Sequence, residues 1–176
     1  ARLYASEKAS VTVTSRDLQK ASSVVAKINE EIKSERVRGV RAQLPEEIGN
    51  AIRNADIVLS AGAAGTLLLP KNMLKEYGKK CRIVADINAI PPLGIEGLKS
   101  EAEGEEFLPK VFGIGALTIG KLKNKVEVEL IKKAADEPKG VFDYKIAYEI
   151  AKRAVSQKSG KGKVPKAENE KYWLPS

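Results

Sequence analysis

The stretch I-V-A-D-I-N-A-I-P-P-L-G-I-E-G, residues Ile83–Gly97, decides the fold of this chain. It begins as an apolar run that only Asp86 interrupts, which is typical of a parallel strand buried on both faces. The Pro-Pro pair that follows fixes its own φ angles and biases the preceding residues to extended backbone. Gly94 and Gly97 permit φ values that are closed to other residues. The stretch therefore predicts a buried strand that runs into a loop on a defined path.

On either side of this stretch, strand and helix signals alternate. Residues 1–8 look like the last turns of a helix; strands are predicted at 10–14, 37–43, 57–59, 83–87 and 111–114, and helices at 18–32, 45–55, 70–78, 119–134 and 143–155. This alternation predicts βαβ units and a Rossmann-like, doubly wound, mainly parallel α/β sheet. A dinucleotide-binding fold begins with a strand and a Gly-rich turn, and neither precedes residue 10. We therefore expect the sheet to lack its first strand and Gly-rich turn.

Composition divides the chain and narrows the classes of function. Residues 1–155 carry apolar periodicity and predict one partial nucleotide-binding domain, whereas residues 156–176 form a lysine-rich tail that we expect to be mobile. Much of the net charge of +8 lies in that tail, and aromatic residues make up only 5%, so we expect no nucleic-acid partner. No run is long enough to cross a bilayer and no signal peptide is visible, so we expect a cytoplasmic protein without a membrane partner.

The sequence contains no histidine and a single cysteine, Cys81. The absence of histidine excludes Ser-His-Asp hydrolysis and histidine-ligated zinc, and we expect no metal site. Cys81 immediately precedes the buried strand and is interpreted as a structural, apolar residue. Any catalysis must therefore use other groups.

Asp86 and Asn88 are the first candidates for such groups. They lie at the end of a predicted parallel strand, where an open α/β sheet places its ligand. The alternative interpretation is a stiff structural loop. The local sequence favours the ligand site and the structural loop about equally.

Ser15 and Arg16 directly follow the first predicted strand, in a strand-to-helix turn. In a dinucleotide-binding sheet an acidic residue at this place selects NAD, whereas a small hydroxyl and an arginine accommodate the 2′-phosphate of NADP. Arg16 can bind phosphate with two parallel hydrogen bonds, and Lys20, one helical turn later, adds a point charge. The alternative is a surface arginine paired with Asp17. The pattern predicts NADP as the cofactor.

A loop of small residues follows the predicted strand at 57–59. Such residues let a backbone approach a flat ligand closely, although tight turns use the same residues. The predicted cofactor-binding residues of this loop are Ala61, Gly62, Ala63 and Gly65.

Four segments together resemble, in order and spacing, a known family. V-T-V-T-S-R, V-L-S-A-G-A-A-G with L-L-P, V-A-D-I-N-A-I-P-P-L-G-I-E-G, and F-G-I-G-A-L-T-I-G-K-L-K are similar to the C-terminal cofactor domain of NADP-dependent methylene-tetrahydromethanopterin dehydrogenase, some members of which use methylene-tetrahydrofolate. The resemblance covers about residues 1–151, and the Pro-Pro-Leu-Gly run is its most specific part. Thr118 and Lys121 depart from it, because the family usually has glycine there.

The resemblance implies an oxidoreductase of one-carbon metabolism, as part of a longer chain or assembly. It implies hydride transfer from the methylene group of a reduced pterin to NADP, with Asn88, Gly115 and Ala116 near the cofactor and Asp86 offsetting the positive charge of the methenyl product. It also implies a pterin partner and a homo-oligomer. Two alternatives stay open. One is a nucleotide-binding module without activity; the other is a shikimate- or glutamyl-type NADP reductase, which shares the Ser-Arg turn but does not explain the Pro-Pro loop.

Overall fold

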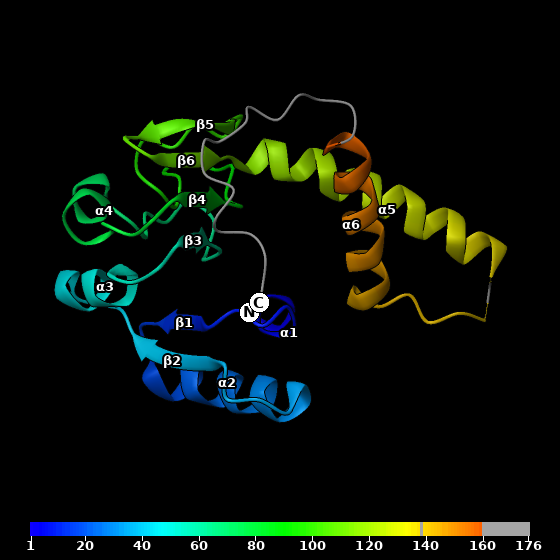
Figure 1. Cartoon of the computed structure of the whole chain (residues 1–176), viewed down its shortest axis with the longest axis horizontal. Helices are drawn as coiled ribbons and strands as arrows, with labels where there is room; N and C mark the ends of the chain where they lie inside the picture. The colour runs from blue at the N-terminus through cyan, green and yellow to red at the C-terminus, as the bar shows by residue number, and fades with distance from the viewer. Residues whose placement is uncertain (138, 160–176) are drawn as a thin grey trace, which may run out of the picture. The chain divides into compact units, whose positions relative to one another are not determined.

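A computed structural model describes residues 1–137 and 139–159. The chain forms two compact units, Ala1–Ile119 and a second that begins at Gly120. The first unit contains all the strands and every predicted site residue (Figure 1). In the described residues, the second unit contains the remainder of helix α5 (Ala116–Asp136) and helix α6 (Tyr144–Ser159).

The first unit begins with a βαβ unit. Helix α1 (Arg2–Ser6) leads into β1 (Val11–Ser15), and α2 (Leu18–Ile32) returns the chain to β2 (Val37–Arg41), which pairs with β1 in parallel. The side chain of Asp17 caps α2 by accepting hydrogen bonds from two backbone N–H groups of its first turn. Ala5, Ile28 and Val37 form a small core between these elements, which holds both helices against the strands.

A second, four-stranded sheet has the order β3-β4-β6-β5. Its strands β3 (Ile57–Ser60), β4 (Ile83–Asp86) and β6 (Val111–Ile114) are parallel, and β5 (Glu103–Leu108) is antiparallel to β6. Helices α3 (Pro45–Ile52) and α4 (Lys71–Tyr77) connect the parallel strands. Val84 and Ile95 have no exposed surface and lie in the main core with Leu74. The apolar run around β4 is therefore the centre of the sheet.

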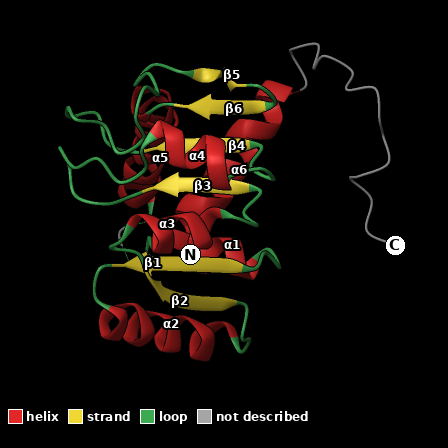
Figure 2. Ribbon diagram, turned by 90° about the vertical axis from the view of Figure 1, so that its left-hand side faces the viewer, coloured by secondary structure: helices red, strands yellow, loops and turns green. Residues whose placement is uncertain are grey.

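The observed fold confirms a mainly parallel α/β, Rossmann-like architecture. Figure 2 shows the strands stacked in one series with helices beside them. Every predicted helix and strand is present, with ends shifted by a few residues. Strand β5 is missing from the prediction, because its sequence E-G-E-E-F-L alternates too few apolar residues to give a strand signal. The parallel strands form two sheets in place of the single predicted one.

The predicted division at residue 155 stays a prediction. The unit boundary lies instead within α5, at residues 119 and 120, and α6 continues to Ser159. The rest of the predicted basic tail, residues 160–176, lies outside the described residues. None of the helices within the described ranges combines the length and apolar character that spanning a membrane requires.

Candidate functional site

The carboxylate of Asp86 anchors the loop that leaves β4. Asp86 is 2% exposed, and its two oxygens accept one backbone N–H each, from Asn88 at 3.0 Å and from Ile95 at 3.0 Å. Within residues 1–137 and 139–159, no lysine or arginine forms an ion pair with it. The buried carboxylate thus fixes the loop at both ends through backbone dipoles alone.

Asn88 holds the middle of the same loop. Its Oδ1 accepts the N–H of Ile90 at 3.0 Å, and its Nδ2 donates to the carbonyl of Pro92 at 3.3 Å. The side chain is 7% exposed, and the peptide bond between Pro91 and Pro92 is cis. Both ends of the amide are therefore occupied by the loop itself.

Gly94 joins this loop to the one after β3. Its carbonyl accepts hydrogen bonds from the N–H groups of both Leu68 and Leu69, each at 2.9 Å. Leu69 and Ile95 then form a short parallel bridge, and the N–H of Glu96 donates to the Leu69 carbonyl at 3.0 Å. The two loops consequently behave as one hydrogen-bonded unit.

Gly94 is also a position where only glycine fits. A Cβ there would overlap Ser60 Oγ and approach both carboxylate oxygens of Asp86, at 3.0 and 3.1 Å. Of the two glycines that permit unusual φ values, Gly97 adopts one, at 77°, and Gly94 does not. Gly94 is required for space. Ser60 is 6% exposed, and its Oγ has no hydrogen-bond partner within the described part of the chain.

The loop after β3 presents small residues at the surface. Ala61, Gly62 and Ala63 are exposed, and Gly65 is half-buried with a φ of 71°. The exposed side chain of Leu68 lies against Gly62, since a Cβ on Gly62 would lie 2.5 Å from its Cδ1. The backbone at residues 61–63 is therefore exposed, with an apolar side chain beside Gly62.

The end of β1 carries a free cationic group. Arg16 is exposed and forms neither a hydrogen bond nor an ion pair within the described residues, whereas Ser15 Oγ accepts the N–H of Asp17 at 3.1 Å. Lys20 is exposed and lies 4.0 Å from the Asp17 carboxylate. The alternative pairing of Arg16 with Asp17 does not occur. Arg16 is thus available for an anion.

Gly115 and Ala116 lie at the end of β6, and both are buried. A Cβ on Gly115 would overlap the carbonyl oxygens of Lys99 and Ser100. Thr118, one of the two departures from the family pattern, donates its hydroxyl to the Glu101 carbonyl at 3.1 Å. The segment of residues 99–101 therefore covers the end of β6, and the Thr118 hydroxyl helps to hold that segment in place.

The structure brings two of the predicted groups together, namely the loop after β3 and the loop after β4. Ser15 is the last residue of β1 in the smaller sheet, Arg16 follows it, and Lys20 lies in the first turn of α2. Gly94 was missed as a site residue, although the glycine that follows Pro-Pro-Leu was a visible signal, and Ser60 begins the small-residue segment that the sequence indicated but was not among the predicted site residues. Their roles remain predictions, as do those of the other site residues. No cluster of acidic or cysteine side chains suited to a metal occurs in the described ranges.

Parallel strands joined by helices, with a loop of small residues at the carboxyl end of one strand, define a Rossmann-like α/β domain. Residues 1–100 match the sequence pattern of the shikimate / quinate 5-dehydrogenase family, and the chain belongs to that family. This match covers β1 to β4 and the loop that carries Asp86 and Asn88.

Two curated relatives come from Methylorubrum extorquens. One is the "Bifunctional protein MdtA", 36% identical over 83% of this chain; the other is an "NAD(P)-dependent methylenetetrahydromethanopterin dehydrogenase", 39% identical over 65% of it. The aligned segments span 50% and 39% of the lengths of these relatives. The resemblance to methylene-tetrahydromethanopterin dehydrogenases is thereby confirmed.

Proposed function

We propose that this chain is the NADP-binding part of a dehydrogenase that oxidises a methylene-tetrahydropterin. The observation that carries the proposal is the pair of joined loops after β3 and β4, together with the names of the two relatives. The reaction moves a hydride from the methylene carbon of methylene-tetrahydromethanopterin, or of methylene-tetrahydrofolate, to NADP and leaves a methenyl cation. It requires no proton transfer, which suits a chain without histidine.

The residues at the end of β1 fit the adenosine end of NADP. Among the described residues Arg16 has no competing partner, so its guanidinium is available to bind the 2′-phosphate, and Lys20 adds positive charge one turn along α2. No carboxylate occupies the strand end to favour NAD, since the side chain of Asp17 caps α2. These features support NADP over NAD.

The joined loops fit the nicotinamide end. Exposed Ala61, Gly62 and Ala63 leave room for a flat ring, and Asn88 holds the adjoining loop rigid. Asp86 supplies a buried negative charge without a cationic partner among the described residues. That charge favours a cationic product next to the loop, because electrostatic interactions are stronger away from water. We therefore propose that Asp86 and Asn88 are the residues that shape the site at the nicotinamide end, where the hydride is transferred.

Binding and turnover test this proposal separately. Binding is measured by titrating the chain with NADP and with NAD while its intrinsic Trp and Tyr fluorescence is recorded. We expect NADP to bind more tightly than NAD. Turnover is measured in the longer polypeptide by hydride transfer to NADP from methylene-tetrahydromethanopterin, methylene-tetrahydrofolate and shikimate, and we expect activity only with the methylene-pterins. Activity with shikimate alone would favour the reductase alternative, which the family match supports.

A further outcome bears on the second alternative. NADP binding without turnover of any of these substrates would favour a nucleotide-binding module.

We also propose that the protein assembles as a homo-oligomer. Light scattering of the same preparation measures the oligomeric state directly.

A further inference from the structure

Strand β2 ends beside the turn that carries the proposed phosphate-binding arginine. Arg41, the last residue of β2, is the register partner of Ser15, the last residue of β1. The N–H of Ala42 donates to the Ser15 carbonyl at 2.9 Å, which keeps the two strand ends together. Neighbouring strands of a sheet lie about 4.8 Å apart. Arg41 therefore lies one strand spacing from the Ser15-Arg16 turn, at the same carboxyl end of the sheet.

The side chains of Arg41 and Ser15 lie on the same face of this sheet. Val11 and Val13 of β1 and Val37 of β2 pack in the small core against α2. Successive side chains of a strand alternate between the two faces, so Ser15 and Arg41 lie on the face of those valines. The side chain of Arg41 is 53% exposed. It thus continues the α2 side of the sheet beyond the end of the apolar core, where a ligand can reach it.

Glu47 holds the guanidinium of Arg41 in place. Its Oε1 accepts hydrogen bonds from Nε and Nη2 of Arg41, at 2.6 and 2.5 Å. Its Oε2 accepts the N–H groups of Gln43 and Leu44, at 2.9 and 3.1 Å. These backbone groups, together with Arg41, lower the pKa of the Glu47 carboxyl to about 2, so it is ionised at neutral pH. One carboxylate therefore closes the turn between β2 and α3, fixes one edge of the guanidinium and offsets its charge.

The two arginines at this end of the sheet are suited to different groups of a ligand. Arg16 has no partner among the described residues, so its charge and its N–H donors are available to a phosphate. Arg41 is already paired, but the flat faces of its guanidinium take no part in the bonds to Glu47, and no aromatic ring of the described residues lies over them. A guanidinium face stacks on flat aromatic rings, and a side chain that is already fixed loses little entropy when it does so.

We propose that Arg41 binds the adenine base of the dinucleotide, and that its guanidinium, fixed by Glu47, stacks on the face of that base. The 2′-phosphate and the base are attached to adjacent carbon atoms of one ribose, so the residues that recognise them must lie close together. Arg16 and Arg41, at the ends of neighbouring strands, fit this requirement. The inference rests on the proposed function only in taking an adenine dinucleotide as the ligand, and it does not depend on the reaction.

AMP is the direct probe of this site, because it carries the adenine base and lacks both the 2′-phosphate and the nicotinamide. The affinities of AMP, NAD and NADP are measured by fluorescence titration of the longer polypeptide that is used for turnover, and of its Arg41→Lys variant. Lysine keeps the charge and the ion pair with Glu47 but has no planar group to stack. We expect all three nucleotides to bind more weakly by the same factor, roughly 3- to 30-fold. Nicotinamide mononucleotide, which has no adenine, is expected to bind as it does to the wild type.

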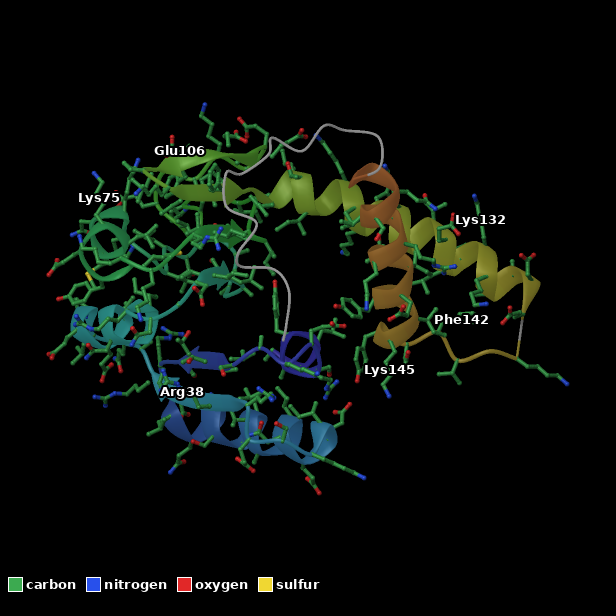
Figure 3. All side chains as sticks on the ribbon, in the orientation of Figure 1. Arg38, Lys75, Glu106, Lys132, Phe142 and Lys145 are labelled. Carbon is green, nitrogen blue, oxygen red and sulfur yellow. The ribbon has the colours of Figure 1, made fainter. Side chains whose placement is uncertain are left out.

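Arg38→Lys is the matched control. Arg38, labelled in Figure 3, belongs to the same strand but lies on the opposite face of the sheet, where its Nε donates to Thr12 Oγ1 at 2.9 Å. We expect the Arg38→Lys variant to bind all four ligands as the wild type does. Urea unfolding of both variants measures any effect on the fold. A lower unfolding midpoint for Arg41→Lys with unchanged AMP affinity would make Arg41 a structural residue and would overturn the proposal.

The remaining outcomes separate this inference from the proposed function. Weaker binding of NADP alone would place Arg41 at the 2′-phosphate, and AMP affinities that are equal in Arg41→Lys and the wild type would remove it from the base; either result overturns the inference and leaves the proposed reaction intact. Equal weakening of AMP, NAD and NADP in a polypeptide that transfers no hydride from a methylene-pterin would support the role of Arg41 and contradict the reaction. Failure of all three nucleotides to bind the wild type would overturn both.

Discussion

Gly94 lies directly against the hydroxyl of Ser60, so closely that a methyl group on Gly94 would overlap Ser60 Oγ. This contact lets the loop after β4 fold down onto the end of β3. It also places the Gly94 carbonyl where two N–H groups of the neighbouring loop reach it. The geometry of the candidate site therefore depends on the absence of one side chain.

Gly94→Ala is expected to destabilise the protein by about 1–3 kcal/mol, the usual cost of overpacking a buried site. Ser60→Ala removes the atom that the new methyl group overlaps, so the double variant should recover part of that loss. Urea unfolding of the wild type, the two single variants and the double variant measures the interaction free energy. Strictly additive effects would show that Ser60 does not constrain Gly94.

Asp86→Asn replaces a carboxylate that accepts two backbone N–H groups by an amide with a single accepting oxygen. One buried N–H loses its partner, which costs about 1–3 kcal/mol. We expect a fall in melting temperature of several degrees. Asp56→Asn, an exposed position just before β3, is the matched control and should leave the melting temperature unchanged. An equal effect at both positions would contradict the anchoring role of Asp86.

Asn88→Ala removes both hydrogen bonds that brace the loop. We expect a loss of about 1–3 kcal/mol in the free energy of unfolding, because the partners of a buried amide are left unsatisfied. NADP affinity should fall at the same time. Asn54→Ala at an exposed site provides the comparison. Loss of turnover with an unchanged melting temperature would instead mean that Asn88 acts on the ligand and not on the loop.

Arg16→Asp tests the preference for NADP. It replaces an unpaired guanidinium with a repelling carboxylate, and loss of a charged hydrogen bond is worth roughly 1.5–3 kcal/mol, or about one to two decades in affinity. We expect NADP affinity to fall by that factor and NAD affinity to change little. Lys27→Asp, exposed further along α2, controls for the same change in net charge. Equal weakening of both nucleotides would remove Arg16 from the 2′-phosphate site.

Glu47 predicts a pH dependence of stability. The N–H groups of Gln43 and Leu44, with the neighbouring Arg41, lower the pKa of its carboxyl from 4.5 to about 2. A pKa lowered by folding means that the stabilisation is present above 4.5 and is lost as the pH falls toward 2. Thermal unfolding of the wild type and of Glu47→Gln should therefore differ near neutral pH and converge at about pH 2. A constant difference between them would contradict this assignment.

Local signals in the sequence were enough to predict most of the elements. The apolar run at β4 predicts a buried strand because a parallel strand is covered on both faces, and Pro45 predicts the start of α3 because it fits the first turn of a helix. The order of strands and helices is likewise visible in the sequence, since hydrophobic periodicity is a local property. The placement of Asp86 and Asn88 at the end of a strand followed from this order.

Other features depended on partners that are distant in the sequence. Strand β5 forms because β6 lies beside it, although its glutamates give little strand signal of their own. The role of Gly94 also depends on distant residues, because its neighbours Ser60 and Leu68 precede it by more than twenty residues. The sequence by itself determined the order of the helices and strands and the position of the strand ends to within a few residues. Only the tertiary structure decided that Asp86 and Asn88 bind backbone groups, that Arg16 has no partner among the described residues, and that the described strands form two sheets, because contacts between separate segments depend on how the chain packs.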